Sequence, residues 1–157
     1  MESQRKSSFR IRRLSARLAV VRLDPGSGVP PWAWIGSFGA VVRTPDELSV
    51  VCDEKAVPTE ARAERGWTAL QLEGPLPFSM TGVLSSLLAP LAANGVPVFV
   101  LSTYDTDCIL VRADQAERAA QVLEAEGHRV VASDGRAGIG RTEPRSGRPA
   151  DADEDAP

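Results

Sequence analysis

The chain has 157 residues, long enough for one or two small domains, and 43% of them are apolar, which is enough for a packed core. Its 18 basic and 21 acidic side chains give a formal net charge of −3, so the whole molecule offers no general attraction to nucleic acid or to an anionic membrane. No run of about 18 apolar residues is present. These features exclude a wholly disordered chain and a transmembrane helix, and they argue against a sequence-independent DNA-binding protein.

The cysteines and the histidine bear on the cellular compartment and on metal binding. Cys52 and Cys108 are far apart in the sequence, and no apolar signal-peptide segment follows the basic N-terminus. We therefore expect a reduced, cytoplasmic protein. Because His128 is the single histidine, it and the two cysteines cannot supply the four ligands of a Cys/His zinc site. We expect neither a metal nor another cofactor.

Both ends of the chain differ in composition from its middle. Residues 1–13 carry five basic side chains and one acidic side chain and are rich in serine, which predicts a disordered basic arm. Such an arm is either a solubilising segment or a contact for nucleic acid or membrane. Residues 134–157 are rich in glycine, proline, arginine and aspartate, and Ile139 is their one large apolar residue. We expect a disordered tail there, because so few apolar groups cannot offset the entropy lost on ordering.

Residues 14–66 have the pattern of short strands with little helix. Apolar and β-branched residues predict strands at 14–23, 38–43 and 48–52. A glycine-containing loop follows the first strand, and the prolines of residues 30–34 allow at most a short helical turn. We expect these residues to form a helix-poor companion to the unit that follows.

From residue 67 the hydrophobic period alternates between strand and helix. The predicted elements are, in order, a strand at 67–72, a helix at 81–94, a hairpin of strands at 96–103 and 107–111, a helix opened by a capping box at 114–117 and ended by Gly127, and a strand at 129–132. This βαββαβ order is the ferredoxin-like arrangement, in which two helices cover one face of an antiparallel sheet. We therefore predict an α+β domain over residues 67–133.

The first predicted helix, residues 81–94, has recognisable signals at both ends. Either Ser79 or Thr81 is suited to cap its start, and Gly95 follows its last residue. Pro90 lacks the amide proton that its turn of the helix would use. We expect the helix to form with a local defect at that residue.

Little in the sequence supports an enzyme. His128 is the only candidate base for a Ser–His–Asp system, and its place just past a predicted helix favours contact with the helix carbonyls or exposure to solvent. Gly135, Gly138 and Gly140 do not have the GxGxxG spacing of a phosphate-binding loop. Cys108 lies within a predicted strand without a histidine nearby in sequence, which favours a core or subunit-contact residue. We expect no catalytic activity.

Two clusters of polar residues remain as a candidate binding site. Residues 79–82 stand at the predicted start of a helix, where backbone N–H groups favour a carboxylate and Gly82 permits close approach of a ligand. Residues 102–107 place hydroxyls and two carboxylates at the predicted hairpin, and a carboxylate is what an ammonium or guanidinium group needs. Direct contact between the clusters requires either the chain topology or a partner chain. The alternative is that these residues only cap a helix and form a turn.

Several segments resemble the ACT-domain subgroup that includes the CASTOR arginine sensors and small bacterial ACT proteins. The similar segments are Phe78-Ser79-Met80-Thr81-Gly82, Ala89-Pro90-Leu91-Ala92, the run from Val98 to Val111 that contains Leu101-Ser102-Thr103-Tyr104-Asp105-Thr106-Asp107, and the run from Thr44 to Glu54. The match covers about residues 14–132. The resemblance implies a tandem ACT protein related to the regulatory part of aspartate kinases.

This resemblance also implies where a ligand binds. In the CASTOR proteins two halves, each similar to this chain, hold an amino acid where their ACT domains meet, so a single half has to form a homodimer to rebuild the site. Met80 stands where the arginine-binding half has a glutamate, which implies a ligand other than arginine. The candidate ligand-binding residues are Ser79, Met80, Thr81, Gly82, Thr103, Tyr104 and Asp107, with Ser86 and Leu87 supplied by the opposite half.

Two functions from different classes follow. The favoured one is a regulatory sensor that binds a small amino acid or a related metabolite at an ACT–ACT interface, without covalent chemistry. The alternative is an interaction module whose ACT units only dimerise and whose charged ends contact another protein or nucleic acid. A screen of amino acids for stabilisation of the folded protein distinguishes the two.

Overall fold

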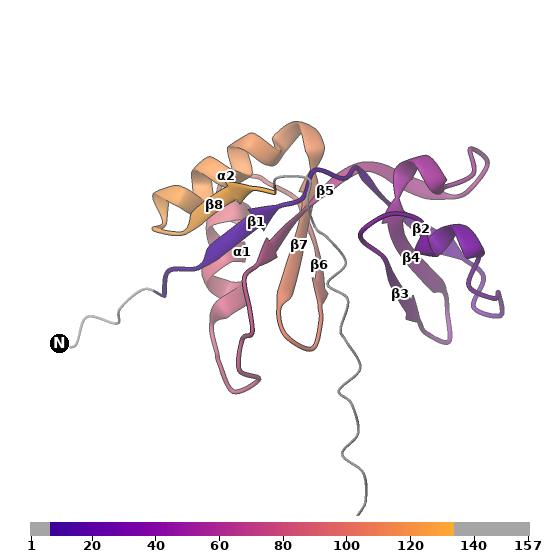
Figure 1. The fold of residues 1–157 in the computed structure, drawn as a ribbon, viewed down its shortest axis with the longest axis horizontal. Coiled ribbons are helices and arrows are strands. Elements are labelled where there is room, and N and C mark those ends of the chain that lie inside the picture. Colours follow the sequence, from indigo (N-terminus) through magenta and orange to yellow (C-terminus); the bar gives the residue numbers. More distant parts are fainter. Residues whose placement is uncertain (1–6, 134–157) are drawn as a thin grey trace, which may run out of the picture.

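One eight-stranded sheet runs through residues 7–133, the part of the chain that this computed structural model describes (Figure 1). The strands are β1 (Arg10–Arg13), β2 (Leu18–Leu23), β3 (Ala40–Arg43), β4 (Leu48–Asp53), β5 (Ala63–Leu72), β6 (Val98–Ser102), β7 (Asp107–Arg112) and β8 (Arg129–Ala132). The helices are α1 (Val83–Ala93) and α2 (Ala116–Ala125), with short 3-10 turns η1 (Pro31–Trp34), η2 (Glu54–Ala56) and η3 (Ala113–Gln115). Within these residues, no helix is long and apolar enough to cross a membrane. The predicted tail at 134–157 lies outside the described residues.

The C-terminal unit has the predicted βαββαβ order, formed by β5, α1, β6, β7, α2 and β8. β7 pairs antiparallel with both β5 and β6. Both helices contribute to one core with the sheet, because their apolar stripes face the same side of β5 and β7. The fully buried members of that core include Leu70, Leu87, Leu91, Ile109 and Leu123. The predicted fold class, α+β with helices on one face of a mostly antiparallel sheet, is confirmed.

Strand β1 corrects the prediction of a disordered basic arm for residues 10–13, whereas residues 1–6 of that predicted arm lie outside the described residues. It lies between β5 and β8, antiparallel to β5 and parallel to β8. Ile11 is fully buried in the core under the helices, whereas Arg10 and Arg12 are exposed. The high charge of the segment hid a strand because alternate residues of a strand point to opposite faces, so one buried isoleucine suffices to anchor it.

His128 helps to hold the start of β1. Its Nδ1 accepts a hydrogen bond of 3.2 Å from the backbone N–H of Phe9, and the two rings stack with centroids 5.6 Å apart. The side chain is 6% exposed. His128 therefore has a structural role inside the protein, and its backbone N–H also donates a 3.1 Å hydrogen bond to the helix carbonyl of Leu123, the kind of contact that its sequence position favours.

The N-terminal unit consists of β2, β3, β4 and the first half of β5, in the order β3-β4-β2-β5. Its core includes Ala19, Val21, Val50 and Cys52 and is covered by 3-10 turns without an α-helix, as predicted. β2 starts at Leu18, later than the predicted strand, because the preceding residues connect it to β1.

The predicted boundary between residues 66 and 67 falls inside β5. Ala63 pairs with Val21 of the N-terminal unit, whereas Leu70 pairs with Ile109 of the C-terminal unit. Gly66, at the middle of the strand, has φ +80°, a conformation that L side chains disfavour. The two units are thus joined by one continuous strand that changes partners just after this glycine, at Trp67, which pairs with both Leu18 and Arg112.

Both helix starts differ from their predicted caps. Gly82 is the N-cap of α1 with φ 79°, and neither Ser79 nor Thr81 caps the helix. The capping box at 114–117 does not form, because the chain enters α2 through η3 and the N-cap Gln115 makes no side-chain cap bond. At the other end of α1 the helix continues through Pro90 as predicted, ends at Ala93, one residue before the predicted end, and is followed by Gly95 with φ 68°. The local defect expected at Pro90 stays a prediction.

Candidate functional site

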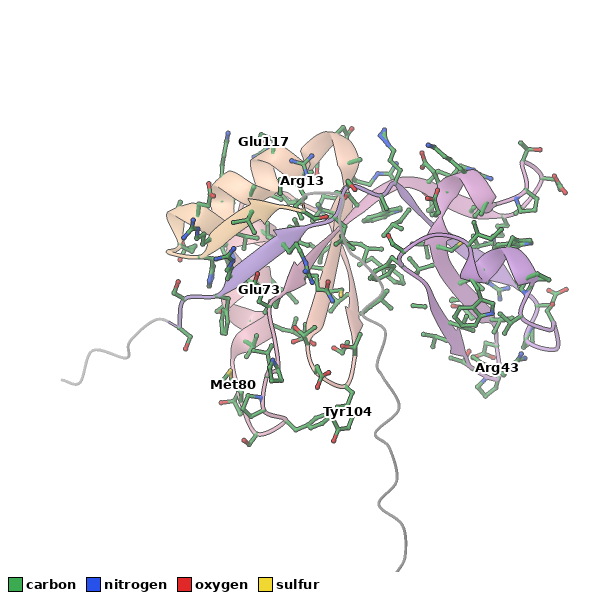
Figure 2. All side chains as sticks on the ribbon, viewed as in Figure 1. Arg13, Arg43, Glu73, Met80, Tyr104 and Glu117 are labelled. Carbon is green, nitrogen blue, oxygen red and sulfur yellow. The ribbon has the colours of Figure 1, made fainter. Side chains whose placement is uncertain are left out.

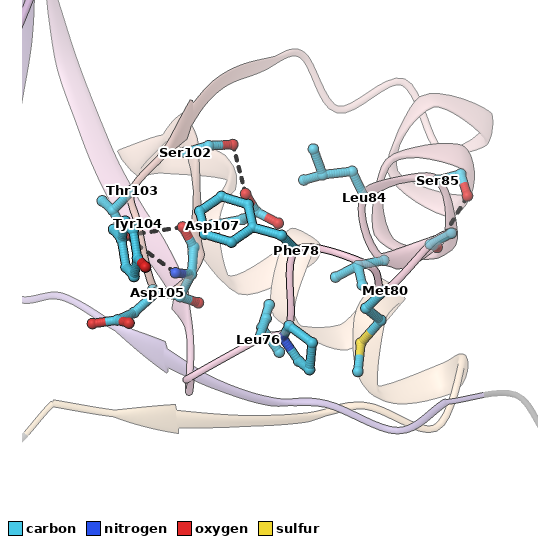
Figure 3. A pocket seen from close by; sticks show the side chains of 14 residues that line it. Leu76, Phe78, Met80, Leu84, Ser85, Ser102, Thr103, Tyr104, Asp105 and Asp107 are labelled. Atoms are coloured by element: carbon cyan, nitrogen blue, oxygen red, sulfur yellow. Dashed lines mark hydrogen bonds between the residues drawn. The ribbon is translucent and has the colours of Figure 1, made fainter.

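A cavity of about 410 Å³ lies between the β5–α1 loop (residues 73–82) and the turn of the β6–β7 hairpin (residues 103–106) (Figure 3). It brings together the two polar clusters singled out in the sequence, within a single chain. The topology explains this, because β5 and β7 are adjacent antiparallel strands and their neighbouring ends lead into the loop and the turn. The lining includes Leu76, Pro77, Phe78, Met80, Gly82, Val83, Leu84, Ser85, Ser102, Thr103, Tyr104, Asp105, Thr106 and Asp107.

Backbone contacts fasten the β5–α1 loop to the hairpin turn. The N–H of Leu76 donates to the carbonyl of Asp105 at 2.7 Å, and the hydroxyl of Thr106 donates to the carbonyl of Leu72 at 2.8 Å. A Cβ added at Gly74 would lie 2.7 Å from the carbonyl oxygen of Asp105. Glycine is required here by close approach, and the two walls of the cavity are held at a defined separation.

Asp107 supplies a carboxylate on the hairpin side of the cavity. It is half-buried at the start of β7, and its Oδ1 accepts a 2.6 Å hydrogen bond from the hydroxyl of Ser102. Asp107 and Asp105 both line the cavity, and Figure 3 shows that the carboxylate of Asp105 points away from Phe78 and Leu84. None of the described residues that line the cavity is basic. Asp107 is therefore suited to a positively charged group.

The start of α1 faces the cavity from the other side. The first backbone bond of the helix runs from the N–H of Ser86 to the carbonyl of Gly82, at 3.0 Å, and no side chain caps the helix. The N–H groups of Val83, Leu84 and Ser85 precede that bond and have no partner within the helix. Together with the positive end of the helix dipole they favour an anionic group such as a carboxylate.

Aromatic and apolar side chains form the outer part of the cavity. Phe78 and Tyr104 meet edge to face, with ring centroids 5.1 Å apart. Met80 is 44% exposed and lies on the same loop as Phe78. Figure 2 places Met80 and Tyr104 at one end of the C-terminal unit, away from Arg43 of the N-terminal unit.

The structure separates the predicted site residues into those near the cavity and those elsewhere. Met80, Gly82, Thr103, Tyr104 and Asp107 line it. The hydroxyl of Thr103 is engaged in its own turn, where it donates to the carbonyl of Thr106 at 3.0 Å and accepts from the Thr106 N–H at 3.2 Å. These residues come together because the helix start and the hairpin turn are neighbours in the fold.

The other four predicted residues do not line this cavity. Ser79 and Thr81 are exposed on the loop. Ser86 is half-buried on α1, and its hydroxyl donates to the carbonyl of Val83 at 2.7 Å. Leu87 is fully buried in the core under α1. The apolar period that makes Leu87 a core residue keeps it out of this cavity, and the role that the resemblance assigned to it in the opposite half stays a prediction.

Sequence reasoning missed several residues of the lining as individual contributors. Leu76, Phe78 and Leu84 form apolar wall, and Ser102 holds the carboxylate of Asp107. Phe78 could have been found from its place beside the polar cluster at the helix start, because a large apolar residue in a predicted loop is not explained by packing in the core. Leu84 lacked such a signal, because its spacing marked it only as part of the helix stripe.

Neither metal nor thiol chemistry is indicated. Residues 7–133 contain no group of three or more His, Cys, Asp or Glu side chains able to hold a metal ion. Cys108, on strand β7, is fully buried. Burial, with a smaller contribution from Asp107, raises the pKa of its thiol to about 11. A protonated buried thiol is a poor nucleophile, so Cys108 is a packing residue.

Comparison with known proteins identifies the family. The sequence profile of the ACT domain matches residues 62–125, and a profile of an N-terminal domain matches residues 17–60. The described part of the chain is similar to the crystal structure of a protein from Agobacterium tumefaciens, with 35% identity, a TM-score of 0.76, and coverage of 80% of this chain and 94% of that one. This chain is an ACT-domain protein of the CASTOR-like type.

Curated relatives of this ACT-domain protein include sensors of arginine. It is 33% identical to the human putative protein CASTOR3P over 87 residues, which is 47% of this chain and 53% of that protein. It is 32% identical to the bovine cytosolic arginine sensor for mTORC1 subunit 1 over 100 residues, or 57% of this chain and 30% of the sensor. The chain thus spans between 30% and 53% of the length of these relatives.

The fold of this ACT-domain protein is shared with aspartate kinases. The E. coli aspartokinase III crystal structure, in complex with aspartate and ADP, gives a TM-score of 0.51 at 14% identity and covers 74% of this chain and 32% of the enzyme. Aspartate kinase of Clostridium acetobutylicum gives 0.54 at 12% identity, covering 74% of this chain and 33% of the enzyme. Identities this low show the fold alone.

Proposed function

We propose that this protein is a regulatory module that binds an α-amino acid in the cavity between the β5–α1 loop and the hairpin turn. The observation that carries the proposal is the pairing of two complementary ends of one cavity. Asp107 presents a carboxylate on one side, and the start of α1 presents backbone N–H groups without a side-chain cap on the other. An α-amino acid carries an ammonium and a carboxylate that match these two ends.

The chemistry is binding without bond formation. The α-ammonium pairs with Asp107, while the hydroxyl of Ser102 keeps that carboxylate oriented. The α-carboxylate accepts hydrogen bonds from the N–H groups at the start of α1, and Gly82 leaves this approach open, since only the Ser85 hydroxyl would lie within 4 Å of an added Cβ. The relatives named as arginine sensors are consistent with an amino-acid ligand.

Regulation follows from where the ligand sits. It bridges the β5–α1 loop, the hairpin turn and α1, so binding favours the arrangement in which these three are held together. A ligand shifts an equilibrium only by its difference in affinity between two states. We infer that the bound protein presents a more fixed surface around α1 and the hairpin to the protein it regulates.

The same proposal includes a homodimer. α1 has no charged side chain along its 11 residues, and β6 consists of half-buried apolar residues up to Ser102 with no strand on its outer edge among residues 7–133. An apolar unpaired edge favours pairing with another chain. In such a dimer, the resemblance implies that Ser86 of one copy contributes to the other copy's cavity.

A thermal-shift screen of the full chain against each of the twenty amino acids tests the proposal. A ligand that binds only the folded state raises the midpoint of unfolding. We expect at least one amino acid to raise it, and we expect the corresponding amino-acid amide, which lacks the carboxylate, to raise it far less. If no amino acid stabilises the protein at millimolar concentration, the proposed function is wrong.

The second candidate is a dimerisation or interaction module without a ligand. The uncharged face of α1 and the apolar edge of β6 favour it, because they need a partner whether or not the cavity is occupied. A stable dimer that ignores every amino acid in the screen is the outcome that selects this candidate over the sensor.

A further inference from the structure

Phe78 and Tyr104 form an exposed aromatic pair at the mouth of the cavity. Their ring planes are 82° apart, and the two side chains are 78% and 81% exposed. Phe78 comes from the β5–α1 loop and Tyr104 from the hairpin turn, so the pair joins the two walls (Figure 3). Large apolar groups gathered in water at one place mark a surface that another molecule covers.

The wall next to this pair is also apolar. Leu76 and Leu84 are half-buried, and Met80 is exposed on the loop that carries Phe78. Figure 3 shows Leu76 and Met80 on the same side of Phe78, opposite the Ser102–Asp107 hydrogen bond. A ligand side chain directed toward this wall meets mostly carbon atoms, and an apolar side chain gains free energy by leaving water there.

The cavity has no further carboxylate positioned to pair with a cation at the end of the ligand's side chain. In the proposed function Asp107 pairs with the α-ammonium of the ligand, and the carboxylate of Asp105, the other acidic residue in the lining, points away from Phe78 and Leu84. An ammonium or guanidinium at the end of the ligand side chain would lose its hydration against apolar groups without a facing carboxylate. Burial of a charge without a partner is strongly unfavourable.

Resting on the proposed function, we propose that the ligand is an α-amino acid with an uncharged, apolar side chain, and that Phe78 and Tyr104 select it. The two rings close over that side chain from opposite walls, while Asp107 and the start of α1 hold the charged groups common to all amino acids. The aromatic pair then selects among ligand side chains, and the two polar ends of the cavity bind the ammonium and carboxylate that all amino acids share. The cavity of about 410 Å³ has room for such a ligand.

Norleucine and lysine test this proposal as a matched pair, because both have an unbranched four-carbon side chain and only lysine adds a terminal ammonium. In calorimetric titrations of the full chain, we expect norleucine to bind at least about tenfold more tightly than lysine, because the terminal ammonium of lysine would lose hydration at the apolar wall without a partner. Equal affinities, or tighter binding of lysine or arginine, overturn the proposal and leave amino-acid binding itself intact. Absence of binding by norleucine and by every natural amino acid overturns both proposals.

Variants of the aromatic pair test which residues select. Phe78→Ala is expected to lower the affinity for norleucine about tenfold and to change the affinity for lysine little. The ratio of norleucine affinity to lysine affinity therefore falls. Tyr104→Phe keeps the ring and serves as the matched control, with an unchanged ratio. Both side chains are exposed, so thermal unfolding of the variants should match the parent protein. A ratio that survives Phe78→Ala overturns the role of the pair.

Met80→Glu provides the opposite change at the same wall. It places a carboxylate where Met80 now contributes an apolar side chain, so we expect affinity for lysine to rise relative to norleucine. The residue is exposed, which keeps the substitution compatible with folding. If the added carboxylate leaves the ratio unchanged, the ligand side chain does not lie against this wall and the proposal is wrong.

Discussion

The backbone N–H of Leu76 donates a hydrogen bond of 2.7 Å to the carbonyl oxygen of Asp105. The two residues are far apart in the sequence and belong to opposite walls of the cavity. Their contact sets the distance between the start of α1 and Asp107, the two polar ends to which an amino acid is proposed to bind. Substitutions that lengthen this hydrogen bond should therefore weaken ligand binding and also lower the stability of the folded protein.

Gly74→Ala is the sharpest such change. Its Cβ would lie 2.7 Å from the carbonyl oxygen of Asp105 and 3.2 Å from the Cβ of Thr106, so the hairpin turn has to move. We expect a loss of about 1–3 kcal/mol in the free energy of unfolding, measured by urea denaturation. Gly26→Ala is the control, because nothing lies within 4 Å of its added Cβ. Equal stability of the two variants would show that the turn is not held against Gly74.

Asp107→Asn tests the pairing with the ligand's ammonium. The substitution removes the charge and keeps the size of the side chain, so we expect binding of the amino acid found in the screen to weaken by about 1.5–3 kcal/mol. Asp105→Asn on the same turn is the matched control: Asp105 also lines the cavity, but its carboxylate points away from Phe78 and Leu84 (Figure 3). Calorimetry distinguishes the two. Similar losses for both variants would mean that the hairpin acts through its overall charge.

Ala89→Arg tests the proposed dimer interface. Ala89 is exposed on the uncharged helix α1, so an arginine there should be tolerated by the monomer and disfavoured between two copies. Light scattering is expected to show a dimer for the parent protein and a shift toward monomer for the variant. Gln121→Arg, at an exposed position of α2, is the control and should stay dimeric. A monomeric parent protein, with and without ligand, contradicts the interface.

Ile11→Ala tests whether β1 belongs to the fold. Ile11 is fully buried between the sheet and the helices, and removing its three side-chain carbons beyond Cβ should lower the free energy of unfolding by about 2–5 kcal/mol. Arg12→Ala, at the adjacent exposed position, should change it by less than about 1 kcal/mol. Chemical denaturation measures both. A small effect at Ile11 would indicate that β1 is dispensable.

Cys108 predicts a loss of stability in alkaline solution. Burial raises the pKa of its thiol from 9.0 to about 11, so the unfolded chain loses this proton at lower pH than the folded protein does. The protonated thiol of Cys108 makes its full contribution to the free energy of unfolding below pH 9. That contribution falls by about 1–3 kcal/mol as the pH rises toward 11. Cys108→Ala should be less stable at neutral pH and should show a shallower decline. Other titrating groups are common to both proteins and cancel in the difference, so parallel curves would refute the assignment.

The local pattern of the sequence determined the elements of the C-terminal unit. Helical spacing marked α1 and α2, alternating and β-branched runs marked β6 and β7, and β8 was predicted with its observed bounds. These signals are local, because a helix or strand that buries one face repeats its apolar residues at a fixed period. The order of the elements then sufficed to predict the ferredoxin-like fold.

Tertiary structure alone decided what these elements contact. The residues around Ile11 show no hydrophobic period, yet they pair with two distant strands and so form part of the sheet. The sequence predicted a boundary between the two units at residues 66 and 67, yet one continuous strand, β5, crosses it and pairs with both units. Ser79 and Thr81 matched the composition of a cap, but Gly82 took that position, since a left-handed residue was needed to turn the loop into α1. The cavity itself arises from the contact of Leu76 with Asp105, and such pairings between distant residues depend on the folded backbone, which no local period encodes.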